Sequence, residues 1–228
     1  MIEPNAFILG DCMQYLKEYP DKYFDLAVVD PVYGDVRQGG YMRGQGGEHA
    51  ARRGLYHLGL WEQPKTERDY FDELFRVSKN QIIWGGNYFA PFLPASQCWL
   101  CWDKKHPEGV SFADVEFAWT SFDQASRIFR FLWSGMLQEN MKDKEHRIHP
   151  TQKPVALYKW ILDRFAKPGS IILDTHVGSG SSIIAFADRG FKYVGFEIDP
   201  DYYEKAQKRI FDETRQISIF EYMNGAGD

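Results

Sequence analysis

The sequence has few cysteines, no long apolar run and no excess of basic residues, and these shortages exclude several classes of protein. Three cysteines among 228 residues are too few for a disulfide framework and fit a reducing compartment. No run approaches the roughly 18 apolar residues that a membrane span needs. The N-terminus also lacks the basic and then apolar segments of a secretory leader. We therefore expect a cytoplasmic protein without a membrane partner.

Cys98 and Cys101 have the C-x-x-C spacing of zinc sites and thioredoxin-like redox motifs. A zinc site would need two further ligands at suitable spacing, and only His106 is near in sequence. A redox motif should open a helix, whereas residues 97–102 look like a strand, which sends positions i and i+3 to opposite faces. We predict that both cysteines fill the core and that no metal is bound.

The net charge of −5 speaks only weakly against a nucleic-acid partner, because the position of charges matters more than their sum. Residues 34–60 contain four arginines and eight glycines and show no apolar periodicity. Such a segment buries too little apolar surface to order itself, and a long loop in a compact domain is usually functional or disordered. We predict a flexible Gly/Arg-rich loop over 34–60, whose arginines either grip phosphates or are merely solvated.

Strand-like and helical patterns alternate along most of the chain, which favours a single α/β domain over residues 1–228 with a largely parallel sheet. No helical pattern separates the strands between residues 98 and 133, so we expect antiparallel pairing there. Thr66 is predicted to cap the helix that ends at Val77. The expected strands are 6–9, 25–29, 81–84, 98–102, 115–120, 128–133, 170–174 and 192–197. The expected helices are 12–19, 66–77, 155–165, one that follows Gly180 and ends at 188, and one from about residue 200.

The stretch from Ile171 to Ser182 combines a buried strand, a glycine-containing turn at Gly178 and Gly180, and a helix. This is the geometry that wraps backbone around a nucleotide-like ligand at the carboxyl edge of a sheet, although Gly-x-Gly turns also occur in many other α/β proteins. Glu197 ends the next strand, where an acidic residue either accepts the hydroxyls of a ribose or is an ordinary solvated acid. The third glycine of the dinucleotide fingerprint is missing, with Ile183 in its place, and no P-loop motif is present. An adenosine that carries no pyrophosphate, as in S-adenosylmethionine, fits better.

Asp30-Pro-Val-Tyr33 follows directly after the apolar run that ends at Val29. It could be a turn that ends a strand, with a tyrosine in the core. It could also be a pocket for a planar base, in which Asp30 and the Pro31 carbonyl accept hydrogen bonds from an exocyclic amine and Tyr33 stacks on the ring. A base inside a duplex cannot be reached in this way, so it would have to be flipped out.

Together these stretches resemble the amino-type DNA methyltransferases of the β arrangement, which modify adenine N6 or cytosine N4. In that family a catalytic Asp/Asn/Ser-Pro-Pro-Tyr/Phe tetrapeptide comes first and a Gly-x-Gly cofactor loop comes late. The matching segments are Leu9-Gly10-Asp11, Asp30-Pro-Val-Tyr33, His149-Pro-Thr-Gln-Lys-Pro154, residues 174–182 and Phe196-Glu-Ile-Asp199. The resemblance implies a circularly permuted Rossmann-like sheet of seven mostly parallel strands, with helices on both faces and a reversed final hairpin.

The resemblance also implies roles for individual residues. The catalytic residues would be Asp30, Pro31 and Tyr33. S-adenosylmethionine, leaving as S-adenosylhomocysteine, would be bound by Asp11, Thr151, Lys153, Asp174, His176, Gly178, Ser179, Gly180, Ser181 and Glu197. Candidate DNA contacts are Arg43, Arg52, Arg53, Arg127 and Arg130, of which the last two could instead face solvent. Residues 103–148 would form a short target-recognition insert. A homodimer and a cognate restriction enzyme stay open as further partners.

The implied reaction is direct displacement at the methyl group of the cofactor, so it needs no cysteine nucleophile. Val32 replaces the second proline of the family tetrapeptide, while the two groups assigned to the target amine remain. Where many relatives have Pro-Phe in the cofactor loop, this chain has Thr175, His176 and Val177, and we expect the last two to supply the pocket wall. An aspartate at the first tetrapeptide position favours adenine N6 over cytosine N4.

Three other functions stay open. Methyltransferases of protein glutamine or RNA use a similar tetrapeptide, although a protein substrate would favour asparagine at its first position and no arginine-rich loop. A dinucleotide-dependent oxidoreductase is disfavoured by the missing third glycine. An inactive homologue would bind DNA without transferring a methyl group. The joint presence of Asp30, Tyr33, Gly178, Gly180 and Glu197 argues against such decay.

Overall fold

A computed structural model describes residues 1–33, 66–106, 113–134 and 137–225, with side chains as far as residue 215. The strands are β1 (Ala6–Leu9), β2 (Phe24–Val29), β3 (Ser78–Trp84), β4 (Trp99–Asp103), β5 (Val115–Thr120), β6 (Arg127–Arg130), β7 (Trp133–Ser134), β8 (Leu137–Gln138), β9 (Ile171–Asp174) and β10 (Lys192–Glu197). The helices are α1 (Cys12–Leu16), α2 (Arg68–Val77), the short 3-10 helix η3 (Gly86–Tyr88), α3 (Val155–Phe165), α4 (Ser181–Asp188) and α5 (Pro200–Gly225).

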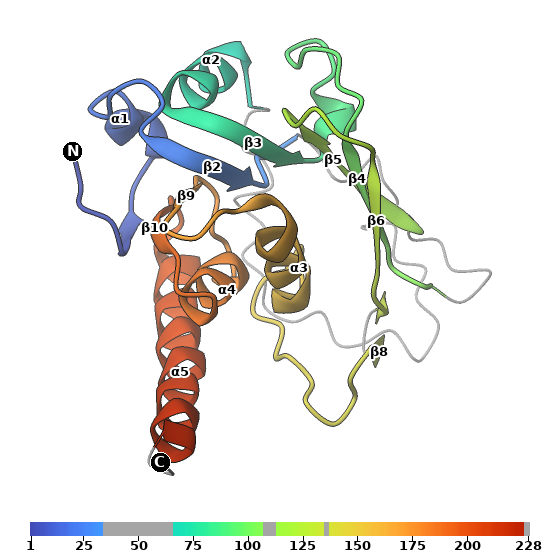
Figure 1. Cartoon of the computed structure of the whole chain (residues 1–228), viewed down its shortest axis with the longest axis vertical. Coiled ribbons are helices and arrows are strands. Elements are labelled where there is room, and N and C mark those ends of the chain that lie inside the picture. The colour runs from blue at the N-terminus through green and yellow to red at the C-terminus, as the bar shows by residue number, and fades with distance from the viewer. Residues whose placement is uncertain (34–65, 107–112, 135–136, 226–228) are drawn as a thin grey trace.

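The described residues form an eight-stranded sheet in the order β1-β10-β9-β2-β3-β5-β4-β6 and a separate β7–β8 pair (Figure 1). The first five strands are parallel to their neighbours, and β5 runs antiparallel to both β3 and β4. This confirms the predicted α/β class, the mostly parallel sheet and the reversed strand in its second half. The sheet has one strand more than the seven that the resemblance implies, because β6 pairs in parallel with β4.

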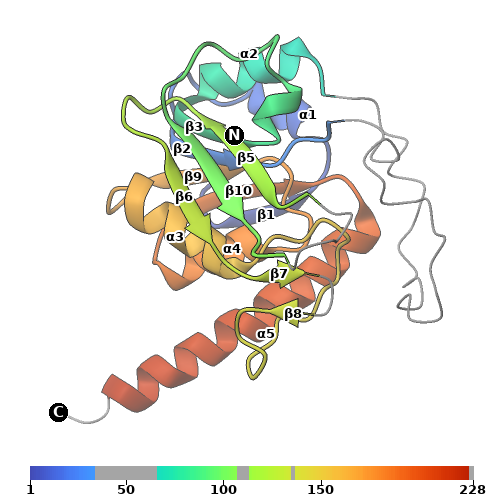
Figure 2. The ribbon, with the colours of Figure 1, turned by 90° about the vertical axis from the view of Figure 1, so that its right-hand side faces the viewer.

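Helices cover both faces of the parallel half of the sheet, as Figures 1 and 2 show. Ala27 and Val29 of β2 belong to the apolar cluster that includes α1 and α2. Leu26 and Val28, which alternate with them, belong to the cluster that includes α3 and α4. A strand segment buried on both faces needs apolar residues at every position, which explains the apolar run over residues 26–29 of β2.

The order of the strands fixes where a ligand can bind. The chain leaves β2 toward β3 on one side and leaves β9 toward β10 on the other, so the connections diverge between the adjacent strands β2 and β9. A crevice opens at the carboxyl ends of parallel strands where the order reverses in this way. Asp30 follows β2 and Asp174 ends β9, so both lie at this edge.

Two helices begin or end elsewhere than predicted. Helix α1 ends at Leu16 rather than at residue 19. Helix α2 begins at Arg68 after Glu67, so the predicted N-cap role of Thr66 is wrong. Both the backbone N–H and the hydroxyl of Thr66 donate to the carbonyl of Val32, at 3.0 and 2.8 Å. These two bonds tie the segment just before α2 to the tetrapeptide. The predicted loop at 34–60 lies outside the described residues.

No helix in the described parts of the chain is long and apolar enough to cross a membrane. Cys98 is buried in the core, as predicted, while Cys101 on β4 is only half-buried.

Candidate active site

Asp30 stands at the point where β2 leaves the sheet, and its two carboxylate oxygens differ. Oδ2 accepts a hydrogen bond from the ammonium of Lys153. Oδ1 is buried and has no hydrogen-bond partner among the described residues. A buried acceptor without a partner is costly, so it marks a place where a donor from outside the chain would be favourable.

Lys153 is the centre of a line of four charged residues. Its side chain is 3% exposed and lies 3.3 Å from Oε2 of Glu116 as well as against Asp30. The other carboxylate oxygen of Glu116 pairs with Lys104 at 2.5 Å. Burial opposes the charge of Glu116, but Lys153 and Lys104 outweigh it and hold its pKa at about 2. Glu116 is therefore ionised at neutral pH.

Burial also affects the pKa values of Asp30 and Lys153. It raises the pKa of Asp30, Glu116 adds to that rise, and Lys153 opposes it. Burial disfavours the charged form of Lys153, but the two carboxylates more than compensate and hold its pKa well above the ordinary value. Lys153 thus stays protonated and is the strongest of the groups that favour the ionised form of Asp30.

Tyr33 lies beside this cluster and stacks on Tyr88, with ring centroids 4.5 Å apart and planes 7° from parallel. Its position depends on Gly85, which has a left-handed φ of +68°. A Cβ at that position would lie 2.8 Å from the Tyr33 ring. One face of Tyr33 is thus covered by Tyr88 before any base is bound.

The glycine turn after β9 brings backbone N–H groups to the same edge of the sheet. Gly178 and Gly180 both have left-handed φ values, +56° and +80°. A Cβ on Gly180 would lie 2.9 Å from Ile210 of α5, whereas one on Gly178 would meet nothing nearer than 3.8 Å. Gly180 is therefore required by packing as well as by conformation, and Gly178 by conformation alone.

Glu197 is fixed by the backbone at the end of β10. Its Oε2 accepts the N–H of Gly178 at 2.7 Å and its Oε1 accepts the N–H of Asp199 at 2.9 Å. Burial raises the pKa of Glu197, while these two N–H groups oppose the rise. Each carboxylate oxygen has a second lone pair to offer, so two acceptor positions remain for a ligand.

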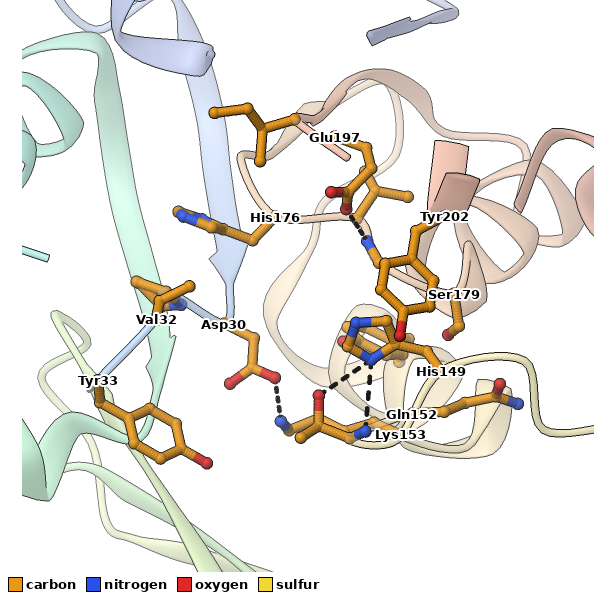
Figure 3. A pocket seen from close by; sticks show the side chains of 16 residues that line it. Asp30, Val32, Tyr33, His149, Gln152, Lys153, His176, Ser179, Glu197 and Tyr202 are labelled. Carbon is orange, nitrogen blue, oxygen red and sulfur yellow. Dashed lines mark hydrogen bonds and ion pairs between the residues drawn. The ribbon is translucent and has the colours of Figure 1, made fainter. Parts of the chain in front are cut away.

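A single pocket joins Asp30 to Glu197 (Figure 3). Nine of the predicted site residues line it: Asp30, Pro31, Tyr33, Thr151, Lys153, His176, Gly178, Ser179 and Glu197. Seven further residues complete the lining: Val32, His149, Gln152, Tyr158, Val177, Ile198 and Tyr202. Among the sixteen, Lys153 is the one permanently charged cation.

Four predicted cofactor residues lie outside this lining. Asp11 caps α1 by accepting the N–H of Met13 at 3.0 Å. Asp174 accepts the N–H of His176 at 3.0 Å, and burial raises its pKa to about 7. Gly180 contacts α5 as described, and Ser181 bonds Arg209 at 2.8 Å. In this structure these four residues contact other parts of the chain and are not part of the pocket lining.

The two pocket histidines are neutral at physiological pH. Burial lowers the pKa of His149 to about 4, with Lys153 adding to the effect. Burial lowers the pKa of His176 to about 4 as well. The sequence offered a signal for His149, because it opens the segment that matches the family. Tyr202 was missed because a tyrosine at this position of α5 looks like an ordinary core residue.

Arg209 was also missed, and it holds the glycine turn in place. Its guanidinium donates to the carbonyl of Ser179 at 3.0 Å and to the hydroxyl of Ser181 at 2.8 Å. It also pairs with Glu145 at 2.7 Å. The other oxygen of Glu145 accepts the N–H of Val155, the first residue of α3. One buried ion pair therefore connects the turn, α5 and the start of α3.

The candidate DNA-contacting arginines are only partly described. Arg43, Arg52 and Arg53 lie outside the described residues. Arg127 and Arg130 are three positions apart on β6, so their side chains point to opposite faces, and Arg130 pairs with Asp103 at 3.5 Å. They do not form a common basic patch. The predicted insert at 103–148 also contains β5, a strand inside the main sheet.

Among the described residues no three His, Cys, Asp or Glu side chains converge to hold a metal ion.

Comparison with known proteins finds a matching family and several relatives. The profile of the family described as "DNA methylase" (N6_N4_Mtase) matches residues 93–208, just over half of the chain. "Putative methylase YubD" of Escherichia coli (strain K12) is 26% identical over 225 residues, which cover 90% of this chain and 90% of that protein. Type II methyltransferase M.HinfI of Haemophilus influenzae is 26% identical over 250 residues, which cover 90% of this chain and 68% of M.HinfI.

Solved structures of DNA methyltransferases share the fold. The PvuII DNA methyltransferase, described as cytosine-N4-specific, superimposes with a TM-score of 0.60 at 12% identity, covering 95% of this chain and 93% of that one. M1.HpyAVI in complex with SAM gives a TM-score of 0.54 at 18% identity, covering 90% of this chain and 98% of that one. These likenesses agree with the α/β topology described above.

Proposed function

Because the chain belongs to the DNA methylase family, we propose that it transfers a methyl group from S-adenosylmethionine to the N6 amine of an adenine that has left the duplex. The observation that carries this proposal is the buried Oδ1 of Asp30, which has no hydrogen-bond partner in the described parts of the chain and shares a pocket with Glu197 and the glycine turn. That pocket combines an acceptor for a base amine with acceptors for a ribose.

The residues at the ends of β9 and β10 fit this cofactor. Glu197 keeps two acceptor positions, which suit the two hydroxyls of a ribose. The one cation in the pocket lining, Lys153, is already paired with Asp30 and Glu116, and both lining histidines are neutral. The third glycine of the dinucleotide fingerprint is also replaced by Ile183, which favours S-adenosylmethionine over a dinucleotide.

S-adenosylmethionine supplies, when bound, a methyl group made electrophilic by a positively charged sulfur. The chain supplies the alignment of the amine that attacks it. Asp30 Oδ1 and the Pro31 carbonyl each accept one N–H of the amine, which directs the nitrogen lone pair out of the plane of the base. Holding the amine in line with the methyl group makes the step effectively unimolecular, which lowers the entropic part of the barrier.

The atoms balance without a covalent enzyme intermediate. A nitrogen–carbon bond forms as the sulfur–carbon bond breaks, and its electron pair stays on sulfur. The nitrogen then carries a positive charge and loses one of its two protons. Asp30 is the base within hydrogen-bond reach of that proton.

Adenine is our choice of base because the tetrapeptide begins with aspartate. The alternative is cytosine N4, since the same two acceptors serve either amine and a cytosine-N4-specific enzyme shares the fold. Adenine and cytosine differ in the base atoms beyond this amine. Neither Asp30 nor the Pro31 carbonyl is assigned a contact with those atoms.

We infer that DNA approaches where the tetrapeptide meets α2. Val32 lines the pocket and Thr66 bonds its carbonyl, so the segment between them starts and ends beside the pocket. That segment carries Arg43, Arg52 and Arg53, which we propose pair with phosphates. Phosphate contacts position a protein on DNA without reading its sequence.

The test is to incubate the purified protein with methyl-labelled S-adenosylmethionine and unmethylated DNA, digest the DNA and identify the labelled nucleoside. The expected product is N6-methyladenine. Label on cytosine N4 would keep the reaction and overturn the choice of base. DNA binding without label, across DNAs of several sequences, would overturn the proposed activity in favour of an inactive DNA-binding homologue.

A further inference from the structure

Lys153 holds a position that its resemblance to the family's cofactor segment does not explain. It comes 123 residues after Asp30 in sequence, yet its ammonium contacts that carboxylate directly. It also contacts Glu116 on β5, and it lies 5.5 Å from the ring centroid of Trp84 at the end of β3. In Figure 3 the Lys153 side chain points at Asp30.

We propose that Lys153 is a positioning residue for Asp30, and that Glu116 and Lys104 set how strongly it acts. Lys153 holds Oδ2 of Asp30 and leaves Oδ1 for the amine of the target base. The proposal rests on the proposed function for its purpose, but the link between Lys153 and Asp30 is a property of the protein alone.

The geometry assigns a different task to each oxygen of Asp30. A carboxylate on a free side chain rotates and presents either oxygen. Here the contact with Lys153 fixes the rotation, because the ammonium is itself held by a second carboxylate. An acceptor fixed in advance costs no reorganisation when the transition state forms.

Glu116 and Lys104 act through Lys153. Glu116 shares the ammonium of Lys153, so it competes with Asp30 for it, and it is also a like charge near Asp30. Lys104 in turn neutralises Glu116 at 2.5 Å. When all four groups are ionised their charges sum to zero, and such pairing is what lets the 3%-exposed Lys153 keep its charge.

The titratable groups that act on Asp30 come from several elements. Lys153 and Lys104 favour its charged form, and Glu116 disfavours it. Asp174 at the end of β9 is a further acidic group that interacts with Asp30. The neutral hydroxyls of Tyr33, Tyr70 and Tyr158 complete the set. Because these last four groups are the same in every variant below, differences between variants report on the lysines and Glu116.

The test is to measure the pKa of Asp30 by carbon NMR, in protein labelled with carbon-13 at the aspartate carboxyl group and without cofactor. The Asp30 signal is the one that disappears in Asp30→Asn. Lys153→Met should raise the Asp30 pKa by about 1–3 units, because an opposite charge at this distance has an effect of that size. Glu116→Gln should lower it by about one unit. Lys104→Met should raise it by less than Lys153→Met.

The decisive result is the order of the Asp30 pKa in the wild type and the three variants. Loosened packing would not move the same pKa in opposite directions. Lys79→Met is the matched control. Lys79 pairs with Asp25 at 2.7 Å near the opposite end of β2, in an exposed position. Removing it should raise the pKa of Asp25 and leave that of Asp30 unchanged. If Lys153→Met does not fold, Glu116→Gln and Lys104→Met alone decide the sign.

A second readout is the pH dependence of kcat/KM for methyl transfer. Its acidic limb should follow the Asp30 pKa, moving to higher pH in Lys153→Met and to lower pH in Glu116→Gln. An Asp30 pKa that is the same in all variants would overturn the proposal, even if methyl transfer proceeds. If the pKa order is found but no methyl is transferred, the link between Lys153 and Asp30 stands and the proposed function fails.

Discussion

The two glycines of the turn after β9 differ in one respect that a matched pair of substitutions can measure. Both have left-handed φ values, so an alanine at either position costs about 1–2 kcal/mol of conformational strain. At Gly178 the new Cβ would meet nothing nearer than 3.8 Å, while at Gly180 it would lie 2.9 and 3.0 Å from two carbons of Ile210. Gly180→Ala therefore adds an overpacking cost of about 1–3 kcal/mol.

Equilibrium unfolding in urea measures both costs. Gly178→Ala should lower the free energy of unfolding by about 1–2 kcal/mol and Gly180→Ala by about 2–5 kcal/mol, the sum of the two terms. Ile210→Ala removes the atoms that clash. The double variant Gly180→Ala/Ile210→Ala should therefore lose less unfolding free energy than the sum of the two single losses. The same partner substitution should show no such coupling with Gly178→Ala.

Equal losses at the two glycines, or additive losses for Gly180→Ala and Ile210→Ala, would refute the reasoning. Either result would mean that α5 moves away from the turn at little cost, and that contact with α5 does not fix the position of the turn.

Two further predictions concern buried charges. The pKa of Asp174 is raised to about 7 in the folded protein, so the folded state binds this proton more tightly than the unfolded state does. As the pH rises from about 4 to about 7, the wild type should therefore lose about 2–4 kcal/mol of unfolding free energy relative to Asp174→Asn. Identical pH dependence of urea unfolding in the two proteins would contradict this. Arg209→Met leaves Glu145 without its partner and should cost about 3–5 kcal/mol in urea unfolding, with part of that loss recovered by adding Glu145→Gln; strictly additive losses would show that the pair does not act as a unit.

Local patterns predicted the elements well where one face or both faces of an element are buried. Residues 115–120, 155–165 and 192–197 contain buried positions and have the predicted bounds, because apolar periodicity reports burial directly. Helix ends were less predictable. Thr66 has the residue type of an N-cap, but the Val32 carbonyl takes its hydroxyl, and that carbonyl is brought close only by the tertiary fold.

Most residues of the site were predicted, but the ion pairs that hold them were not. The resemblance directed attention to Asp30 and Lys153 separately, but nothing in the sequence pairs residues so far apart. Glu116 sits on a strand where a charged residue usually faces solvent, and Arg209 sits in a helix rich in charged residues. Both pair with residues from other elements, so their roles depend on which strands and helices are neighbours.

The most direct test of the central claim separates cofactor binding from methyl transfer in Asp30→Ala. Binding of S-adenosylmethionine is measured by calorimetry, and transfer to unmethylated DNA is measured in a single turnover. We expect the variant to bind the cofactor nearly as tightly as the wild type, because Glu197 and the glycine turn are intact. We expect it to transfer the methyl group at least about 10²-fold more slowly. A variant that transfers at the wild-type rate would contradict the assignment of Asp30 as the residue that holds the target amine.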